Sequence, residues 1–428
     1  LVLLWFGSWK NSMSCYAPEW VKKDIEKFPR ALDINSMGKE ILTTFSSNNL
    51  EADKKAFVML MKHLKEIDSD DNTVIMVQVE NEIGMIPDAR DYYGKANEAF
   101  KSDVPAELTG YLKEHKENLI PEFLDYWKGN GYKTSGTWEE IFGKSLKTDE
   151  VFMAWQYSKY VEEITSAGKA EYPLPMFVNA ALIREGYKPG QYPSAGPLPH
   201  IMDIWRAGAP SIDFLSPDIY FPNFVEWCKK YDRSGNPLFI PEATGNHQSA
   251  ANAFYAIGNH NAIGFSPFAI ESLDPENHRL TQSYNVLSQL TPVIFQHQGK
   301  GTMAGVLLDK DNPEEKIKLG SYTLNFSFEL NDRYASQPAD EDPRGGGLVI
   351  QTSNDEYIIA GSGLIVTFES NNNEFPIAGI VSIDEGKYAD GQWIAGRRLN
   401  GDQNHQGRHI RLPYGSFSIQ HIKLYQYK

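Results

Sequence analysis

The sequence has little cysteine and no long uninterrupted apolar run. Its only two cysteines, Cys15 and Cys228, cannot form a disulfide framework in a chain of 428 residues, and they lack the spacing of metal ligands. No apolar run approaches the ~18 residues of a membrane span. The opening residues also lack the basic stretch and the small-residue cleavage site of a signal peptide. We therefore expect no membrane insertion.

Positive charge is also scarce. The chain has 41 Lys and Arg against 56 Asp and Glu, which gives a formal net charge of −15. Such an acidic chain is a poor partner for nucleic acid or for an anionic membrane surface. Aromatic residues, by contrast, make up 12% of the sequence. They suit either large cores or sugar-binding clefts, and composition leaves both interpretations open.

Up to about residue 300, apolar strand-like runs alternate with amphipathic helices. Apolar residues from Leu50 to Ile67 recur at a period near 3.6, and a second helix follows Asp149, its expected N-cap. Shorter helices are expected at 199–208, 223–231, 247–258 and 278–291, and region 85–147 reads as a helical insertion. This alternation indicates a parallel sheet covered by helices on both faces, within a domain spanning 1–300. The expected strands are 1–6, 74–79, 175–180, 213–221, 237–243 and 263–270.

After Gly301 the hydrophobic period changes to two. In "SYTLNFSFEL" (321–330) apolar and polar residues alternate, as a half-buried antiparallel strand requires. Several similar runs follow, separated by turn residues. We expect an all-β sandwich domain over 301–428. Within it, the acidic loop "PADEDPRGGG" (338–347) either binds calcium or is simply solvated.

Glutamates stand where two of the expected strands end. Residues Glu80, Asn81 and Glu82 follow the strand at 74–79, and Glu242 lies near the end of the strand at 237–243. Parallel α/β sheets place their chemistry at the carboxyl ends of strands. Two carboxyl groups with different pKa values are what hydrolysis of a glycosidic bond needs. The sequence has no metal-ligand spacing and no Gly-rich phosphate loop, so we expect no cofactor and no metal.

The stretch "QVENEIG" resembles the "QVENEYG" signature of glycoside hydrolase family 35, the β-galactosidases, in clan A of retaining glycosidases. The layout of the chain is similar to the divergent bacterial branch of that family. The resemblance implies that Glu82 is the acid/base, that Asn81 holds the sugar 2-hydroxyl and that Glu242 is the nucleophile. It also implies that Tyr220 hydrogen-bonds the nucleophile and that Asn179 contacts the sugar.

Three more residues are candidate sugar contacts. Two of them, Trp9 and Asn11, follow the first strand. Trp9 is either a stacking platform for sugar or a core residue. Phe268 stands where the clan often has a tryptophan on the eighth strand. Glu80 is interpreted as a structural residue or a secondary contact, and His247 and His260 as cap or core residues.

The position of the two glutamates in the strand order bears on the fold. They lie on the second and the fifth of the six expected strands, whereas the clan has them on the fourth and the seventh. The resemblance therefore implies a (β/α)8 TIM barrel that lacks its first two βα units in this chain. The strands at 1–6 and 263–270 should then not pair with each other. If those units are absent altogether, we expect poor stability and little activity.

The expected function is that of a retaining β-glycosidase, most like a β-galactosidase, that hydrolyses terminal β-linked sugars of oligo- or polysaccharides. In such an enzyme the carboxyl groups of Glu82 and Glu242 lie about 5–5.5 Å apart. The alternatives are a non-catalytic carbohydrate-binding or scaffold protein, and a clan A glycosidase acting on β-glucosides, mannosides or xylan-derived substrates. The resemblance implies a periplasmic or secreted protein, and an oligomer is compatible with the sequence.

Overall fold

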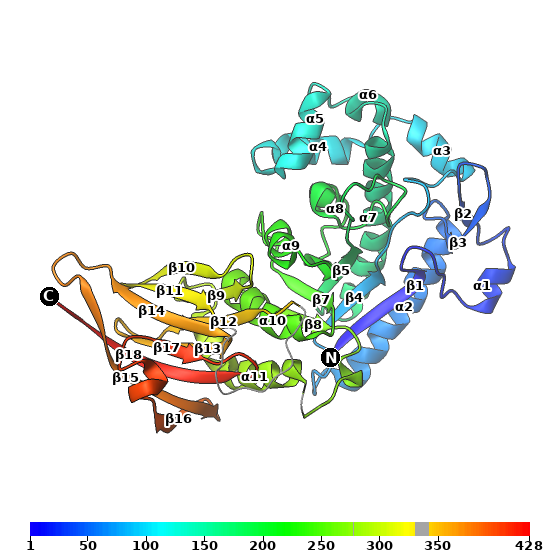
Figure 1. The fold of residues 1–428 in the computed structure, drawn as a ribbon. Helices are drawn as coiled ribbons and strands as arrows, with labels where there is room; N and C mark the ends of the chain where they lie inside the picture. The colour runs from blue at the N-terminus through cyan, green and yellow to red at the C-terminus, as the bar shows by residue number, and fades with distance from the viewer. Residues whose placement is uncertain (277, 330–341) are drawn as a thin grey trace. The chain divides into compact units, whose positions relative to one another are not determined.

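A computed structural model describes residues 1–276, 278–329 and 342–428 (Figure 1). The chain forms two compact units. The first comprises Leu1–Asp218 with Lys230–Pro237, and the second comprises Ile219–Lys229 with Leu238–Lys428. The expected division between residues 300 and 301 stays a prediction. Part of the acidic loop for which calcium binding is an alternative, residues 338–341, lies outside the described residues.

Six parallel strands alternate with helices in the part of the chain that precedes residue 300. Their order in the sheet follows the chain, and β1 and β8 are the two ends of that order. The predicted fold class is confirmed: a partial TIM barrel is followed by a domain of antiparallel sheets. The run "MFVNA" in β5 is buried along its whole length and is apolar apart from Asn179, as expected for a sheet covered on both faces. The strands are β1 (Val2–Lys10), β4 (Met76–Asn81), β5 (Met176–Ala181), β6 (Phe214–Ile219), β7 (Phe239–Ala243) and β8 (Gly264–Pro267).

The two long helices of the first unit form where the periodicity predicts them. Helix α2 (Ser47–Asp68) begins after Ser46, whose side chain accepts a hydrogen bond from the backbone of Asn49. The expected N-cap of α7 (Leu146–Glu171) was wrong, because Ser145 has the extended backbone of a cap and accepts from Thr148 N at 3.3 Å. Asp149 lies instead in the first turn.

Apart from α10 and α11, which have 14 and 19 residues, the remaining helices are short. Among the described residues none is long and apolar enough to span a membrane. The sequence predicted neither α1 nor the hairpin of β2 and β3.

The remaining elements before the antiparallel domain are, in chain order, α1 (Glu19–Lys23), β2 (Arg30–Leu32), β3 (Gly38–Leu42), α3 (Gly94–Lys101), α4 (Ala106–Glu114), η1 (Lys116–Asn118), α5 (Pro121–Gly129), α6 (Trp138–Phe142), η2 (Pro199–Ile201), α8 (Met202–Gly208), α9 (Phe224–Tyr231), α10 (His247–His260), η3 (Ile270–Ser272) and α11 (Arg279–His297).

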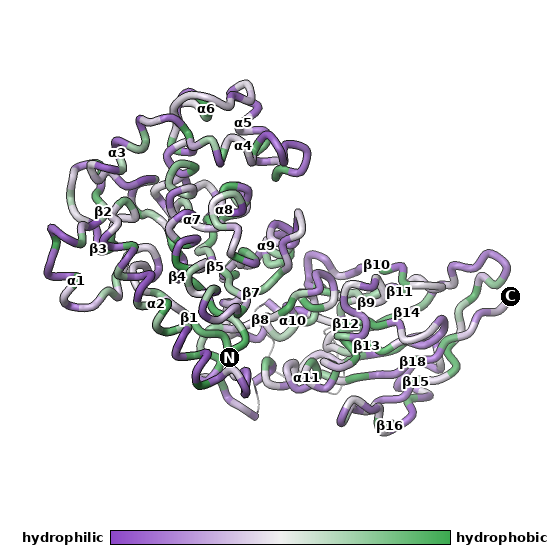
Figure 2. The backbone as a smooth tube through the Cα atoms, turned by 180° about the vertical axis from the view of Figure 1, so that it is seen from behind, coloured by the Kyte–Doolittle hydropathy of each residue, from purple (hydrophilic) through white to green (hydrophobic). Residues whose placement is uncertain are grey.

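Two antiparallel sheets make up the domain after residue 300. Apolar and polar residues alternate along Tyr322–Phe328, as the sequence predicts, and both hydrophobic and hydrophilic segments are seen along the strands of this domain in Figure 2. One apolar core contains residues from both sheets, including Phe326, Val366 and Ile422, so the sheets pack as a sandwich. The four-stranded sheet has the order β10 (Glu314–Leu319), β11 (Tyr322–Phe328), β14 (Leu364–Ser370), β17 (Ile410–Leu412); the six-stranded sheet has the order β16 (Gln392–Arg398), β15 (Ile377–Ala389), β18 (Ser418–Tyr427), β13 (Glu356–Ser362), β12 (Gly345–Gln351), β9 (Met303–Leu308). The 3₁₀ turn η4 (Gly401–Asn404) precedes β17.

Helix α10 lies directly against the six-stranded sheet, and glycines make this approach possible. A Cβ atom added at Gly305 of β9 would lie 2.7 Å from the carbonyl oxygen of Tyr255. One added at Gly346 of β12 would lie 2.5 Å from the Cα of Ala251. Real Cβ atoms do not approach backbone so closely. The helix and the sheet therefore contact each other backbone to backbone.

Candidate functional site

Glu82 follows the last residue of β4, and its backbone is held at both ends. Its N–H donates to Asn179 Oδ1 at 2.9 Å, and its carbonyl oxygen accepts from the hydroxyl of Ser12. The φ angle of Glu82 is 48°, in the left-handed region that glutamate rarely adopts. Such a conformation costs on the order of 1–3 kcal/mol and persists where the surroundings enforce it. The structure thus fixes the direction in which the half-buried Glu82 side chain leaves the strand.

Amide side chains surround this strand end. Asn81 is buried; its Nδ2 donates to Asn11 Oδ1 at 2.9 Å, and its Oδ1 accepts from Gln78 Nε2 at 3.0 Å. Asn179, at the end of β5, donates from Nδ2 to Asp218 Oδ2 on β6 at 2.7 Å. One hydrogen-bonded network therefore runs along the carboxyl ends of three neighbouring strands.

Glu80 points to the interior instead. It is buried beside Asp53 of α2, and its Oε2 accepts from Trp9 N at 3.1 Å. Asp53 accepts from Trp5 Nε1 at 3.0 Å and from Tyr160 OH at 3.0 Å. Burial, and then the charge of Asp53, hold the pKa of Glu80 well above its usual range. Asp53 accepts more hydrogen bonds than Glu80, and these bonds favour its charged form, so the shared proton resides on Glu80. This agrees with the structural role expected for Glu80.

This proton makes the stability of the protein depend on pH. Folded Glu80 keeps a proton that the unfolded chain releases above about pH 4.3. The free energy of unfolding should therefore fall as the pH rises from there toward the folded pKa, by roughly 1 kcal/mol per pH unit. Glu80→Gln should remove this part of the pH dependence in urea unfolding followed by tryptophan fluorescence. Glu66→Gln, an exposed change on α2, should leave it unchanged, and parallel profiles for wild type and Glu80→Gln would contradict the assignment.

Trp9 is a core residue rather than a stacking platform. It is 0% exposed, and its ring packs edge-on against Tyr157 and Tyr160, with centroids 5.7 and 4.9 Å away. A ring with no accessible face cannot stack on a sugar. The proposal of Trp9 as a substrate contact was therefore wrong, because the aromatic residues of α7 cover it.

Glu242 lies on β7 in the second unit, and its partner is the one that the resemblance implies. Tyr220 OH donates to Glu242 Oε2 at 2.7 Å. The half-exposed tyrosine fixes one carboxylate oxygen and leaves the other for chemistry. Phe268 follows β8, where its backbone N donates to Ala243 O at 2.8 Å. Its side chain is 60% exposed, as a sugar-stacking ring has to be.

The structure thus groups the predicted residues within each unit. It joins Asn11, Asn81 and Asn179 to the strand end that carries Glu82, and it joins Tyr220 to Glu242. The separation of the two glutamates stays a prediction. Sequence reasoning missed Asp218 and Ser12. An aspartate inside the apolar run "FLSPDIYF" was a usable signal, whereas nothing in the sequence marks Ser12.

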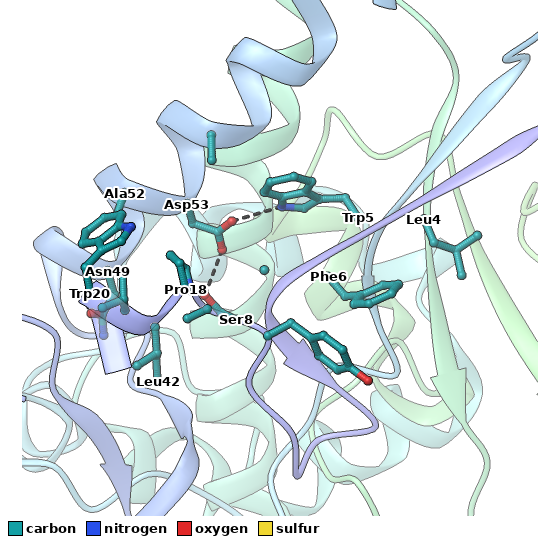
Figure 3. Close-up of a pocket in the computed structure, with 15 residues that line it drawn as sticks. Leu4, Trp5, Phe6, Ser8, Pro18, Trp20, Leu42, Asn49, Ala52 and Asp53 are labelled. Carbon is teal, nitrogen blue, oxygen red and sulfur yellow. Dashed lines mark hydrogen bonds between the residues drawn. The ribbon is translucent and has the colours of Figure 1, made fainter. Parts of the chain in front are cut away.

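A separate cavity of about 330 Å³ lies between β1, α2 and residues 16–21 (Figure 3). Its walls are largely apolar, with Trp5, Phe6 and Trp20 among them. Asp53 faces it while bonded to Trp5 and Ser8, as the dashed lines show. Neither Glu82 nor Asn81 lines this cavity. It is therefore not the candidate catalytic site. Across residues 1–276, 278–329 and 342–428 no group of three His, Cys, Asp or Glu side chains is placed to hold a metal ion.

A sequence model of one protein family matches part of the chain. The family is described as a domain of unknown function, DUF5597, and the match covers residues 280–411. That range runs from α11 through most of the antiparallel domain. The comparison with curated proteins gives no match.

Among solved structures, the chain is similar to several β-galactosidases. The enzyme from the psychrophilic Marinomonas ef1 is 12% identical, with a TM-score of 0.38 over 59% of this chain and 42% of that one. The enzyme from Bacillus circulans sp. alkalophilus is 14% identical, with a TM-score of 0.40 over 66% and 46%. Gan42B, a GH42 β-galactosidase from G. stearothermophilus, is 11% identical, with a TM-score of 0.48 over 96% and 87%. The chain spans less than half the length of the first two enzymes. At these identities the likeness concerns the fold alone.

Proposed function

We propose that this protein is a retaining β-glycosidase that acts on terminal β-linked sugars, most like a β-galactosidase. The observation that carries the proposal is the environment of the two strand-end glutamates. Glu82 is fixed in a strained backbone conformation beside an amide network, and Glu242 is oriented by Tyr220. A binding module has no need of two glutamates held in this way. The enzyme is therefore favoured over a carbohydrate-binding scaffold.

In this mechanism Glu242 attacks the anomeric carbon through Oε1, the carboxylate oxygen that does not accept from Tyr220. Glu82 donates a proton to the glycosidic oxygen as that bond breaks, which leaves a covalent glycosyl-enzyme and releases the aglycone. Glu82 then takes a proton from water, whose oxygen attacks the anomeric carbon and frees Glu242. Asn81 would hold the 2-hydroxyl of the sugar, where hydrogen bonds strengthen in the transition state. Because Asn81 is buried and bonded to Asn11 and Gln78, this role requires it to exchange one of these bonds for the sugar hydroxyl.

The sugar is the finer part of the proposal. Ile83 stands where family 35 enzymes have a tyrosine, so glucosides, mannosides and xylosides are the competing substrates. A screen of p-nitrophenyl β-glycosides should give the highest kcat/KM with the galactoside. Proton NMR of the first-formed sugar should show the β-anomer, because two displacements retain configuration. First-formed α-anomer would indicate inversion, and turnover of no glycoside together with binding of oligosaccharides would favour the scaffold.

A further inference from the structure

A second cavity in the first unit has the features of a ligand site. Its volume is about 320 Å³, at the lower end of the about 300–1,000 Å³ of small-molecule pockets. It is formed by α5, the N-terminal part of α7, the loop after β5 and η2. Neither Glu82 nor Glu242 lines it. Its residues therefore have no role in the proposed chemistry.

The polar end of the cavity is built around a buried carboxylate. The side chain of Glu150 is 1% exposed, and its Oε1 accepts from Tyr192 OH at 2.8 Å. Its Oε2 accepts from His200 Nε2 at 2.8 Å. Because a carboxylate only accepts, Nε2 carries the hydrogen and the other ring nitrogen of His200 is an acceptor in the neutral ring. These bonds fix the rotamer of each group before any ligand arrives.

The fixed charges of the cavity cancel. Glu122 at its rim is paired with Arg233 Nη1, at 2.9 and 3.0 Å from its two carboxylate oxygens. The wall also carries one lysine, Lys147, whose single positive charge equals that of Glu150 in size; its Nζ lies over the Tyr126 ring, 5.6 Å from the centroid. A phosphate or an ammonium ion would find no excess of opposite charge here. The cavity therefore suits a neutral ligand that carries hydrogen-bonding groups.

Aromatic rings form much of the remaining wall. Tyr126 comes from α5, and Tyr187 and Tyr192 come from the loop after β5. Tyr187 is 45% exposed, so its ring is accessible to a ligand. Flat rings beside planar hydrogen-bonding groups match a sugar, which has a face of C–H groups and an edge of hydroxyls.

The loop that carries Tyr187 is joined to the segment after Glu82. Met85 N donates to Ser194 O at 2.8 Å, and Ser194 N donates to Met85 O at 3.0 Å. Gly84 lies so close to Pro193 that a Cβ there would be 2.8 Å from the backbone of the proline. A ligand in the cavity would therefore contact a loop that is fixed to the end of β4.

We propose that this cavity binds a neutral saccharide unit, as a subsite separate from the two glutamates. The choice of a saccharide among neutral ligands rests on the proposed function. The binding itself does not require hydrolysis, so it can be measured on its own. Tyr187 supplies the stacking face, and His200 and Tyr192 supply hydrogen-bonding groups at the polar end.

Isothermal titration of the full chain with lactose, cellobiose and xylotriose tests this proposal. At least one probe should bind, and Tyr187→Ala should raise its Kd about fivefold to tenfold, as expected for loss of an aromatic contact. Tyr187→Phe should restore binding, because stacking needs the ring and not the hydroxyl. Tyr427→Ala, which removes a similarly exposed ring (41%) at the end of β18, should not change the Kd.

The outcomes separate this proposal from the proposed function. If aryl glycosides are hydrolysed but no probe binds, or if Tyr187→Ala leaves every Kd unchanged, the subsite is refuted and the glycosidase stands. If Tyr187→Ala raises the Kd and Tyr187→Phe restores it while no glycoside is hydrolysed, the subsite stands without the enzyme. In an active enzyme, Tyr187→Ala should raise KM for xylotriose or lactose.

Discussion

Replacing Glu242 with alanine should abolish turnover of every β-glycoside, with a loss of about 10³-fold or more in kcat. No covalent intermediate can form without this carboxylate, and a good leaving group cannot compensate for a missing nucleophile. The loss should therefore be equally severe for p-nitrophenyl and for alkyl glycosides. Tyr220→Phe should cost much less, since it removes only the 2.7 Å hydrogen bond that orients Glu242 Oε2.

Glu82→Ala should behave differently, because its first task is to protonate the leaving group. For poor leaving groups we expect a loss of about 10²–10⁴-fold, the usual range of general-acid catalysis. For 2,4-dinitrophenyl glycosides the first step should survive, and azide should restore the second step as a glycosyl azide of retained configuration. Glu271→Ala, which removes an exposed glutamate after β8, is the matched control and should change neither step. Equal losses for good and poor leaving groups would contradict the acid/base role of Glu82.

A large effect on stability is expected where α10 contacts β9. Gly305→Ala should lower the free energy of unfolding by about 1–3 kcal/mol or more, because overpacking against backbone forces α10 away from β9. The new methyl group would lie within 2.7–2.8 Å of backbone atoms of Tyr255, Phe254 and Asn259, none of which is the free end of a side chain. Thermal and urea unfolding followed by circular dichroism would measure the loss.

The same substitution elsewhere provides the control. At Gly110, inside α4, nothing lies within 4 Å of an added Cβ. Gly110→Ala should therefore stabilise the protein by about 0.5–1 kcal/mol, through the higher helix propensity of alanine. If both variants unfold at the same midpoint, the close approach of α10 and β9 does not exist in solution.

Much of the barrel and of the candidate site was predictable, because both follow from the order of apolar and polar residues within short segments of the sequence. Apolar runs located β4 and β5 to within two residues, and the polar residues that end those strands are the ones that form the amide network. The N-cap of α7 was missed, since both Ser145 and Asp149 are capping residue types and only the backbone geometry decides between them. Once inside the helix, Asp149 pairs with Arg90 at 3.4 Å, and burial raises its pKa to about 6.

Other features were not predictable because they join residues far apart in the sequence. Asp53 and Glu80 belong to a helix and a strand that meet only in the folded chain. The residues next to Trp9 in the sequence do not show whether its ring faces solvent or the core. The ring is buried because Tyr157 and Tyr160, on the distant helix α7, pack against it. The left-handed backbone of Glu82 likewise depends on Asn179, which lies almost a hundred residues later.

The contact between α10 and the six-stranded sheet has a consequence for the order of events during synthesis. Helix α10 ends at His260, but β12, which contributes Gly346 to its contact surface, begins at Gly345. The strands on which β12 depends are complete only when β18 has been made, at Tyr427. At about 5–20 residues per second, a ribosome leaves the helix without its partner for several seconds. The strands that follow α10 in the chain, from β12 to β18, therefore determine when this helix can dock, and the helix has to be kept from aggregating until they have emerged.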